Sequence, residues 1–196
     1  LDKAWMRKVI LCTGYMACSV EDTLGKNYKN LEIIYSVENE SLGTAGALKL
    51  AYPFLLAEQI LVMNGDSFVE YDVYELFSYH LKKEAVASIV LAEVDDVSRY
   101  GEIEVNSEGE VRRFAEKGDK SGVGWINAGV YLMKKDVLNT VPDETPFSLE
   151  RQLFPTLIGK ELYGYKTNRK FIDIGTPESY AVADNFFGQL TLDSSS

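Results

Sequence analysis

The segment Gln59-Ile60-Leu61-Val62-Met63-Asn64-Gly65-Asp66 is an apolar run that ends in a polar turn. A short apolar run bounded by turn residues is typical of a buried strand. The polar triplet then places the carboxylate of Asp66 at the carboxyl end of that strand, where open α/β sheets bind ligands. The same triplet is also ordinary turn composition, so a plain turn remains an alternative.

Apolar runs of strand length alternate with segments of helical period on both sides of this stretch. We expect strands at residues 8–13, 31–37, 59–63 and 86–94, and helices at 16–24, 44–56 (bent at Pro53) and 73–83. Residues 8–13 have the composition of a buried strand. The βαβαβαβ order predicts a mostly parallel sheet with helices on both faces.

The second half of the sequence is less regular. Residues 102–105 and 110–115 flank the turn Asn106-Ser107-Glu108-Gly109, which predicts a hairpin. Further strands are expected at 125–133, 162–166 and 170–174, and helices at 148–157 and from Pro177 onward. Together the pattern predicts one mixed α/β domain over residues 1–188, followed by a flexible tail at 189–196.

The first five residues, Leu1 to Trp5, have the composition of the end of a helix that leads into the first strand. An α/β sheet seldom begins with half a helix. We therefore expect a βα unit upstream of Leu1, which an open reading frame extending upstream would support.

Composition limits the classes of function. The sequence has 196 residues, of which 46% are apolar, and a formal net charge of −10. Such a charge repels nucleic acid, and no basic cluster offsets it. No apolar run approaches the roughly 20 residues that cross a bilayer, so no membrane association is expected. An anionic ligand would need a metal ion or a local lysine.

The cysteines and the single histidine do not indicate a catalytic centre. Cys12 and Cys18 have no Cys or His companions at metal-binding spacing, so we expect buried, reduced thiols in a cytoplasmic protein. His80 lies in a helical pattern, where a surface or core-edge position is expected. A nucleophilic triad is not supported, because the only histidine has no suitable context.

A second strand-end carboxylate occurs in Phe171-Ile172-Asp173-Ile174-Gly175-Thr176-Pro177. Thr176 is placed to cap the helix that begins at Pro177, so Asp173 has no evident structural role. Asp66 and Asp173 are therefore a candidate pair for one Mg²⁺ that bridges phosphates.

The segment Glu38-Asn39-Glu40-Ser41-Leu42-Gly43-Thr44-Ala45-Gly46 joins a strand to a helix. Free N–H groups at the start of the helix would suit an anion or a carbonyl. Gly43 and Gly46 would let a flat base approach the backbone, and Glu38 could accept paired hydrogen bonds from a guanine edge. An ordinary capped helix is an equal alternative.

A final group of polar residues could contact a sugar phosphate. Gly101, Glu116 and Asn127 suit sugar hydroxyls, and Lys117 suits a phosphate. Each signal is weak alone, since Glu116 and Lys117 would ordinarily be a solvated strand end.

Taken in order, these pieces resemble the nucleotidyl transferase family, which makes nucleotide sugars from a nucleoside triphosphate and a sugar 1-phosphate. The resemblance runs from Lys8 to about Phe187. Within the family it is greatest to D-glycero-D-manno-heptose 1-phosphate guanylyltransferases, with mannose-1-phosphate guanylyltransferases close competitors. The motifs that carry it are Leu42-Gly43-Thr44-Ala45-Gly46-Ala47, Asn64-Gly65-Asp66, Tyr100-Gly101, Glu116-Lys117, Asn127-Ala128-Gly129 and Asp173-Ile174-Gly175-Thr176-Pro177.

The resemblance implies a Rossmann-like α/β/α sandwich and a specific set of roles. Mg²⁺ would be held by Asp66 and Asp173. The nucleotide, with GTP favoured, would meet Glu38, Gly43 and Thr44. The sugar would meet Tyr100, Gly101, Glu116 and Asn127, with Lys117 beside its phosphate as a catalytic residue. The sugar phosphate would attack the α-phosphorus in line and expel pyrophosphate, in a cytoplasmic pathway such as lipopolysaccharide or capsule biosynthesis.

One departure from the family pattern affects these expectations. The family's opening Gly-rich loop with its Arg, and the Pro-Lys pair that follows, have no counterpart in the sequence. We therefore expect weak catalysis by this chain alone, and an exposed sheet groove that would favour a homo-oligomer. The alternatives are a non-catalytic nucleotide-sugar-binding homologue and a metal-dependent glycosyltransferase of related fold.

Overall fold

The computed structural model describes residues 6–193, and the chain divides into two compact units. Unit 1 consists of Leu1–Ile60 and Met133–Lys160, and unit 2 of Leu61–Leu132 and Glu161–Ser196. A single domain over residues 1–188 stays a prediction. The expected helix end at residues 1–5 lies outside the described residues.

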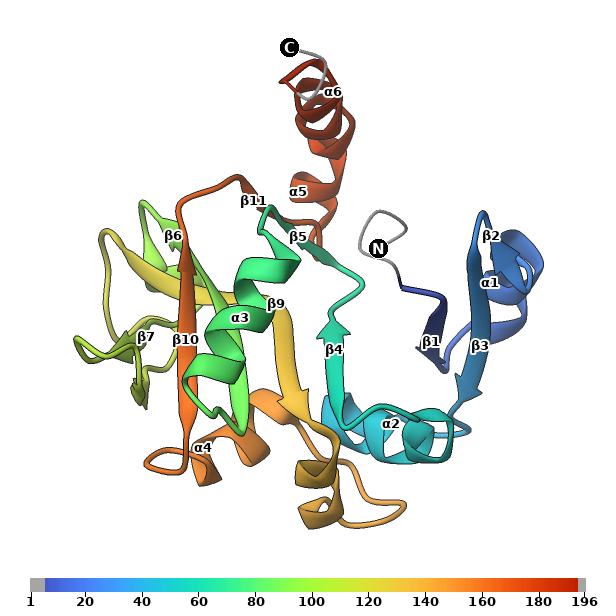
Figure 1. The fold of residues 1–196 in the computed structure, drawn as a ribbon. Helices are drawn as coiled ribbons and strands as arrows, with labels where there is room; N and C mark the ends of the chain where they lie inside the picture. Colours follow the sequence, from blue (N-terminus) through green and yellow to red (C-terminus); the bar gives the residue numbers. More distant parts are fainter. Residues whose placement is uncertain (1–5, 194–196) are drawn as a thin grey trace. The chain divides into compact units, whose positions relative to one another are not determined.

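Unit 1 contains a three-stranded sheet in the order β1-β3-β2 (Figure 1). The strands are β1 (Lys8–Thr13), β2 (Asn27–Tyr28) and β3 (Leu31–Val37). Strands β1 and β3 are parallel, with Cys12 opposite Ser36 and Thr13 opposite Val37. Helix α1 (Ala17–Leu24) lies between β1 and β2 in the chain, and it ends at Gly25, which has a φ of 66°. The expected strand–helix–strand order is confirmed.

The expectation that residues 8–13 form a buried strand is wrong. No residue of β1 is fully buried, because β1 lies at the edge of its sheet. Cys12 and Cys18 are free and exposed rather than buried. Burial was expected because a run of apolar residues looks the same in a central strand and in an edge strand.

The helical part of unit 1 is more broken than expected. Helix α2 (Gly43–Ala51) passes into a 3₁₀ turn, η2 (Tyr52–Phe54), at the expected bend. The helix expected at 148–157 is a π-helix, η5 (Leu149–Leu153), followed by the short helix α4 (Phe154–Thr156). A 3₁₀ segment that the sequence did not suggest, η4 (Lys135–Thr140), follows strand β9 (Gly124–Lys134).

A four-stranded sheet in the order β10-β6-β9-β4 forms the centre of unit 2 and includes the two strands that cross the unit boundary. The strands are β4 (Gln59–Met63), β6 (Ala87–Val94), β9 (Gly124–Lys134) and β10 (Leu162–Thr167). Strands β6 and β10 are parallel, and the arrow of β9 points opposite to that of β10 (Figure 1). Mixed α/β architecture is therefore confirmed.

Helix α3 (Val73–Lys82) covers one face of this sheet and begins at an Asp72 cap. Its Leu76 is fully buried among sheet residues such as Val90 and Ile126. His80 of the same helix is also fully buried, and its Nδ1 lies 2.9 Å from the hydroxyl of Ser88. The expected surface or core-edge position for His80 is therefore wrong, because a polar partner on β6 makes its burial tolerable.

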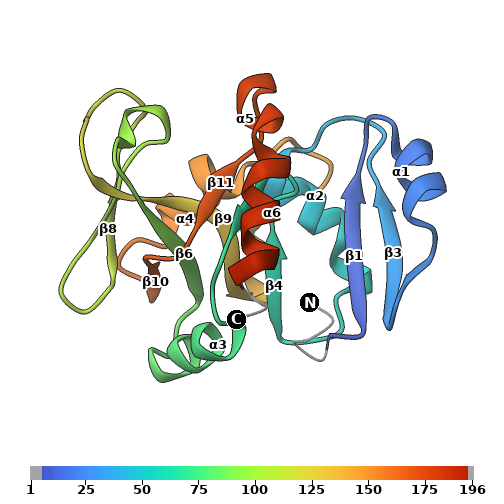
Figure 2. The same ribbon diagram turned by 90° about the horizontal axis from the view of Figure 1, so that it is seen from above.

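The remaining elements of unit 2 carry or adjoin several of the candidate site residues. The 3₁₀ turn η3 (Val97–Arg99) precedes the predicted hairpin, which is formed by β7 (Ile103–Val105) and β8 (Val111–Phe114). Strand β5 (Ser67–Val69) pairs antiparallel with β11 (Phe171–Asp173). Figure 2 shows α5 (Pro177–Ala181) and α6 (Ala183–Asp193) following β11.

Two further expectations can be compared with these helices. Thr176 caps α5 in a reciprocal capping box with Ser179, as the sequence predicted. Helix α6 extends to Asp193, beyond the expected end of the domain at residue 188. Across residues 6–193, no helix combines the length and apolar composition needed to span a membrane.

Candidate active site

Asp66 and Asp173 are brought together by the pairing of β5 with β11. Asp66 is the last residue before β5, and Asp173 is the last residue of β11. The pairing sets Asp173 opposite Ser67, and the N–H of Ile174 donates to the carbonyl oxygen of Asp66 at 2.8 Å. Two residues far apart in the sequence are thus adjacent in unit 2.

The two carboxylates face the same point beside Gly175. A Cβ placed on Gly175 would lie 3.0 Å from Oδ1 of Asp173 and 3.6 Å from Oδ2 of Asp66. Mg²⁺ is commonly held by one or two carboxylates together with substrate phosphates and waters. The pair fits such an ion, although the described residues include no cluster of three or more Asp, Glu, His or Cys side chains suited to a metal.

Asp173 does have a structural role, contrary to the sequence analysis. Its Oδ1 accepts a hydrogen bond from the N–H of Gly175 at 2.7 Å. This bond closes the turn between β11 and α5 and fixes the direction of the carboxylate. The remaining lone pairs of the carboxylate can still bind a cation, so the two roles are compatible.

The turn that carries Asp66 rests on Gly129 of β9. The N–H of Asn64 donates to the carbonyl oxygen of Gly129 at 2.8 Å, and the hydroxyl of Ser67 donates to that of Ala128 at 3.2 Å. Gly129 has a φ of 76°, and a Cβ there would collide with Ser67 Oγ and lie 3.1 Å from Asn64. The glycine of the Asn127-Ala128-Gly129 motif therefore makes room for the Asp66 turn.

Asn127 is held rigidly two residues before this glycine. Its Oδ1 accepts from the N–H of Gly129 at 2.9 Å, and its Nδ2 donates to the hydroxyl of buried Tyr131 at 2.9 Å. One amide hydrogen and one lone pair remain for a further partner. Asn127 thus combines a support role with the capacity to bind a hydroxyl group.

Gly101 and Glu116 lie beside one another at the base of the β7–β8 hairpin. Gly101 has a φ of 87°, and a Cβ there would lie 2.5 Å from the carbonyl oxygen of Ala115. Glu116 and Lys117 are exposed, and the N–H of Glu116 donates to Oδ2 of Asp119 at 3.3 Å. The predicted sugar-binding pair is therefore adjacent, with an exposed cation next to it.

The ring of Tyr100 links this hairpin to the strand that carries Asp173. It packs edge-to-face against Phe171 of β11, with ring centroids 5.9 Å apart. The turn before Tyr100 is held by Asp96, whose carboxylate accepts from the N–H groups of Ser98 and Gly122 at 3.0 and 3.2 Å. These bonds, those from Ser98 first, hold the pKa of Asp96 below its usual value.

The candidate nucleotide residues belong to unit 1. Glu38 follows β3, and its Oε2 accepts a hydrogen bond from the N–H of Leu42 at 3.0 Å. Oε1 lies beside Gly14, 3.0 Å from the position that a Cβ would take there. Glu38 is only partly buried, so its carboxylate has a fixed position and lone pairs that remain available.

The expectation of free N–H groups at the start of α2 is wrong for two of its residues. The N–H groups of Ala45 and Gly46 both donate to the carbonyl oxygen of Phe147, at 2.8 and 3.1 Å. A Cβ on Gly43, whose φ is 68°, would lie 2.9 Å from that oxygen. The carbonyl oxygen of Phe147, just before η5, thus accepts from the N–H groups that the sequence suggested for binding an anion or a base.

Thr44 is also engaged within unit 1. Its hydroxyl donates to Oε2 of Glu150 at 2.8 Å and accepts from the N–H of Leu149 at 2.8 Å. These two bonds join the start of α2 to the start of η5. No local pattern in the sequence indicates this contact, because the partners are over 100 positions apart.

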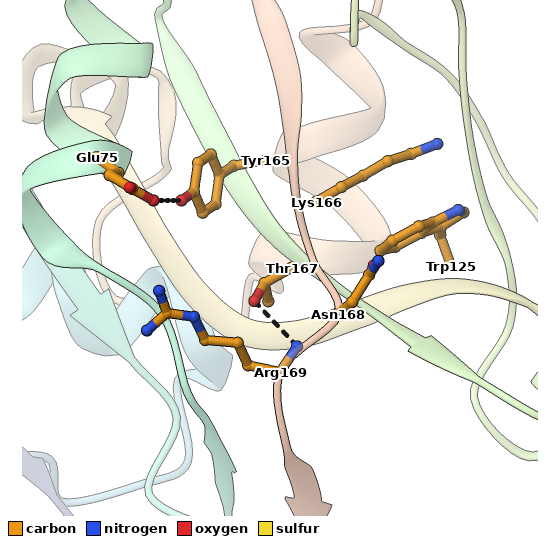
Figure 3. A pocket seen from close by; sticks show the side chains of 7 residues that line it. All are labelled: Glu75, Trp125, Tyr165, Lys166, Thr167, Asn168 and Arg169. Atoms are coloured by element: carbon orange, nitrogen blue, oxygen red, sulfur yellow. Dashed lines mark hydrogen bonds between the residues drawn. The ribbon is translucent and has the colours of Figure 1, made fainter.

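An open hollow of about 510 Å³ in unit 2 was not expected from the sequence. Figure 3 shows Glu75 and Tyr165 on one side of β10, joined by a hydrogen bond of 3.1 Å, and Lys166 and Trp125 on the other. Lys166 Nζ lies 4.6 Å from the centroid of the Trp125 ring. Because side chains alternate along a strand, Trp125 lies on the same face of β9 as Asn127.

Solved structures of similar fold show the class of the chain, which is a mixed α/β fold. The chain superimposes on HddC from Yersinia pseudotuberculosis with a TM-score of 0.82 and 33% identity, covering 95% of this chain and 81% of that one. A structure of HddC complexed with GMP-PN gives a TM-score of 0.83, with the same identity and coverage.

Sequence comparison then gives the family. The nucleotidyl transferase model matches residues 1–189, so the chain belongs to that family. It is 34% identical to D-glycero-alpha-D-manno-heptose 1-phosphate guanylyltransferase of Aneurinibacillus thermoaerophilus, over 93% of this chain and 79% of the relative. It is 33% identical to mannose-1-phosphate guanyltransferase of Schizosaccharomyces pombe, over 92% of this chain but about half (51%) of that protein.

Proposed function

We propose that this protein transfers a nucleotidyl group, GMP from GTP, to heptose 1-phosphate or mannose 1-phosphate and releases pyrophosphate. The observation that carries the proposal is the convergence of Asp66 and Asp173 beside Gly175. Family membership and the guanylyltransferase names of the relatives support the same reaction. Both substrates are anions, and a protein with a net charge of −10 needs a local positive centre to hold them.

Mg²⁺ held by Asp66 and Asp173 would supply that centre and offset charge on the phosphates during transfer. The chain's own residues orient the reactants. Tyr100, Gly101, Glu116 and Asn127 position the sugar, and Lys117 lies beside its phosphate. Orientation for in-line attack requires no covalent link to the protein.

On the nucleotide side, we assign base recognition to Glu38. A guanine edge presents two N–H donors, and a carboxylate can accept both. Gly43 contributes by allowing the backbone path at the start of α2, and Thr44 contributes by fastening α2 to η5. A cytoplasmic location is part of the proposal, because nucleoside triphosphates and sugar phosphates are cytoplasmic metabolites. Pairing into a homo-oligomer also stays a prediction.

A screen of pyrophosphate release tests this proposal. The full-length protein is incubated with Mg²⁺, each of four nucleoside triphosphates, and heptose, mannose or glucose 1-phosphate. We expect the greatest turnover with GTP and either heptose or mannose 1-phosphate. Hydrolysis of a nucleotide sugar without pyrophosphate release would instead favour a glycosyltransferase, and binding without turnover would favour a non-catalytic homologue.

A further inference from the structure

The φ angle of Gly14 does not require a glycine at this position. Gly14 follows β1, and its φ is not in the left-handed region that favours glycine. Any L-residue could adopt this backbone conformation. Whether a side chain fits at position 14 is therefore decided by the residues beside it.

What lies beside Gly14 is the side chain of Glu38. A Cβ at position 14 would lie 2.9 Å from Cγ, 3.0 Å from Oε1 and 3.4 Å from Cδ of Glu38. These three atoms are the nearest ones outside the neighbouring residues of the chain, so every other such atom would lie at least 3.4 Å away, at ordinary van der Waals contact or beyond. A side chain at position 14 would therefore collide with the carboxylate arm alone, and with no backbone atom.

The backbone places these two residues side by side. Strands β1 and β3 are parallel and end together, with Thr13 opposite Val37. The N–H of Glu38 then donates to the carbonyl oxygen of Thr13 at 2.8 Å. Gly14 and Glu38 are thus the first residues after two neighbouring carboxyl ends, where α/β proteins bind ligands.

A second contact fixes the opposite side of the same carboxylate. Oε2 accepts from the N–H of Leu42 at 3.0 Å, while Oε1 lies 3.0 Å from the position that a Cβ on residue 14 would take. The carboxylate is therefore held between the 38–42 turn and the surface of Gly14.

We propose that Gly14 is a positioning residue for base recognition: by lacking a Cβ, it lets the Glu38 carboxylate lie where both oxygens can meet a guanine edge. This inference rests on the proposed role of Glu38. A methyl group at position 14 would push a flexible side chain and leave the strands in place. The expected loss is therefore in selectivity for the base, with folding largely preserved.

Binding of GMP and IMP by isothermal titration calorimetry tests the inference. IMP lacks the 2-amino group and so offers one donor fewer to the carboxylate. A hydrogen bond to a charged group is worth about tenfold in affinity, so the wild-type protein should bind GMP about tenfold more tightly than IMP. In Gly14→Ala this ratio should fall to about one, with the thermal unfolding midpoint nearly unchanged.

Gly124→Ala provides a matched control. A Cβ there would lie 2.8 Å from Val97 Cγ1 and 3.0 Å from Oε1 of Glu102, so it crowds another glutamate to a similar degree. Its GMP-to-IMP ratio should equal that of the wild type. Glu38→Gln, which keeps the size of the side chain, should lose the preference as Gly14→Ala does.

Two results would overturn the proposed role of Gly14. A Gly14→Ala variant that keeps the wild-type ratio, or that unfolds, overturns the inference. A wild-type protein that binds GMP and IMP equally removes Glu38 from the base edge and the inference with it. Pyrophosphate release with any nucleoside triphosphate would in that case still support nucleotidyl transfer, so the two failures are distinguishable.

Discussion

Oδ1 of Asp173 and Oδ2 of Asp66 lie 3.0 and 3.6 Å from one point, the position where Gly175 would carry a side chain. The β5–β11 pairing sets Asp173 opposite Ser67, the residue after Asp66, and so brings the two carboxylates together. A cation bound by both carboxylates would offset the repulsion between their charges. The proposed divalent ion would supply that charge.

Replacing Asp66 or Asp173 by Asn should reduce turnover by at least about 10²-fold, because each change removes a charged ligand of the proposed ion. Pyrophosphate release from GTP measures the loss. Thermal stabilisation by added Mg²⁺, which requires no turnover, should vanish in the same variants. Asp22→Asn, an exposed change on α1, is the control. Retained activity would remove the substituted residue from the metal assignment.

Gly129→Ala should destabilise the protein by about 2 kcal/mol, because the residue has a φ of 76° and its new methyl group would meet Ser67 and Asn64. Urea unfolding followed by circular dichroism gives the free energy of unfolding. Gly65→Ala is the comparison, since a Cβ there meets no atom within 4 Å. Equal losses in both variants would contradict the support role of Gly129.

Thr44→Ala should cost about 1–2 kcal/mol of stability, because it removes the acceptor for the N–H of buried Leu149 and the donor to Glu150. Thr44→Ser keeps the hydroxyl and should remain within about 0.5 kcal/mol of the wild type. Chemical unfolding of the three proteins checks this order. If Thr44→Ser loses as much stability as Thr44→Ala, then Thr44 stabilises the protein through packing of its methyl group and not through hydrogen bonding.

Asp96 should make stability depend on pH in the acid range. Its folded-state pKa lies below the ordinary value of 3.8, chiefly because the N–H of Ser98 donates to it. A lowered pKa contributes stability above the ordinary value, and this contribution is lost as the pH falls through the lowered pKa. The unfolding midpoints of the wild type and Asp96→Asn should therefore differ at pH 6 and converge below about pH 4.

The control for this pH series is Asp95→Asn, a change at the exposed neighbouring residue. Its difference from the wild type should stay constant across the same range. A wild-type curve parallel to that of Asp96→Asn down to pH 3 would show that the Asp96 hydrogen bonds do not depend on its charge.

Much of the fold follows from local patterns in the sequence. The run Gln59–Met63 forms a strand with Asp66 just after it, and Thr176 caps the helix that begins at Pro177, both as predicted. These features are determined by residues within a few positions of one another. Side-chain periodicity, capping and proline geometry act over that range, so the sequence alone decides them.

Contacts between residues that are distant in the sequence are set by the tertiary structure. The carbonyl oxygen of Phe147 accepts hydrogen bonds from the N–H groups of Ala45 and Gly46. The hydroxyl of Ser88 lies within hydrogen-bond distance of buried His80. Cys12 is exposed because its strand lies at the edge of a sheet. Each of these features depends on elements that are distant in the sequence, and no local sequence pattern indicates which elements will be neighbours. Strand order, register and loop approach depend on how whole elements pack, and packing is a property of the assembled fold.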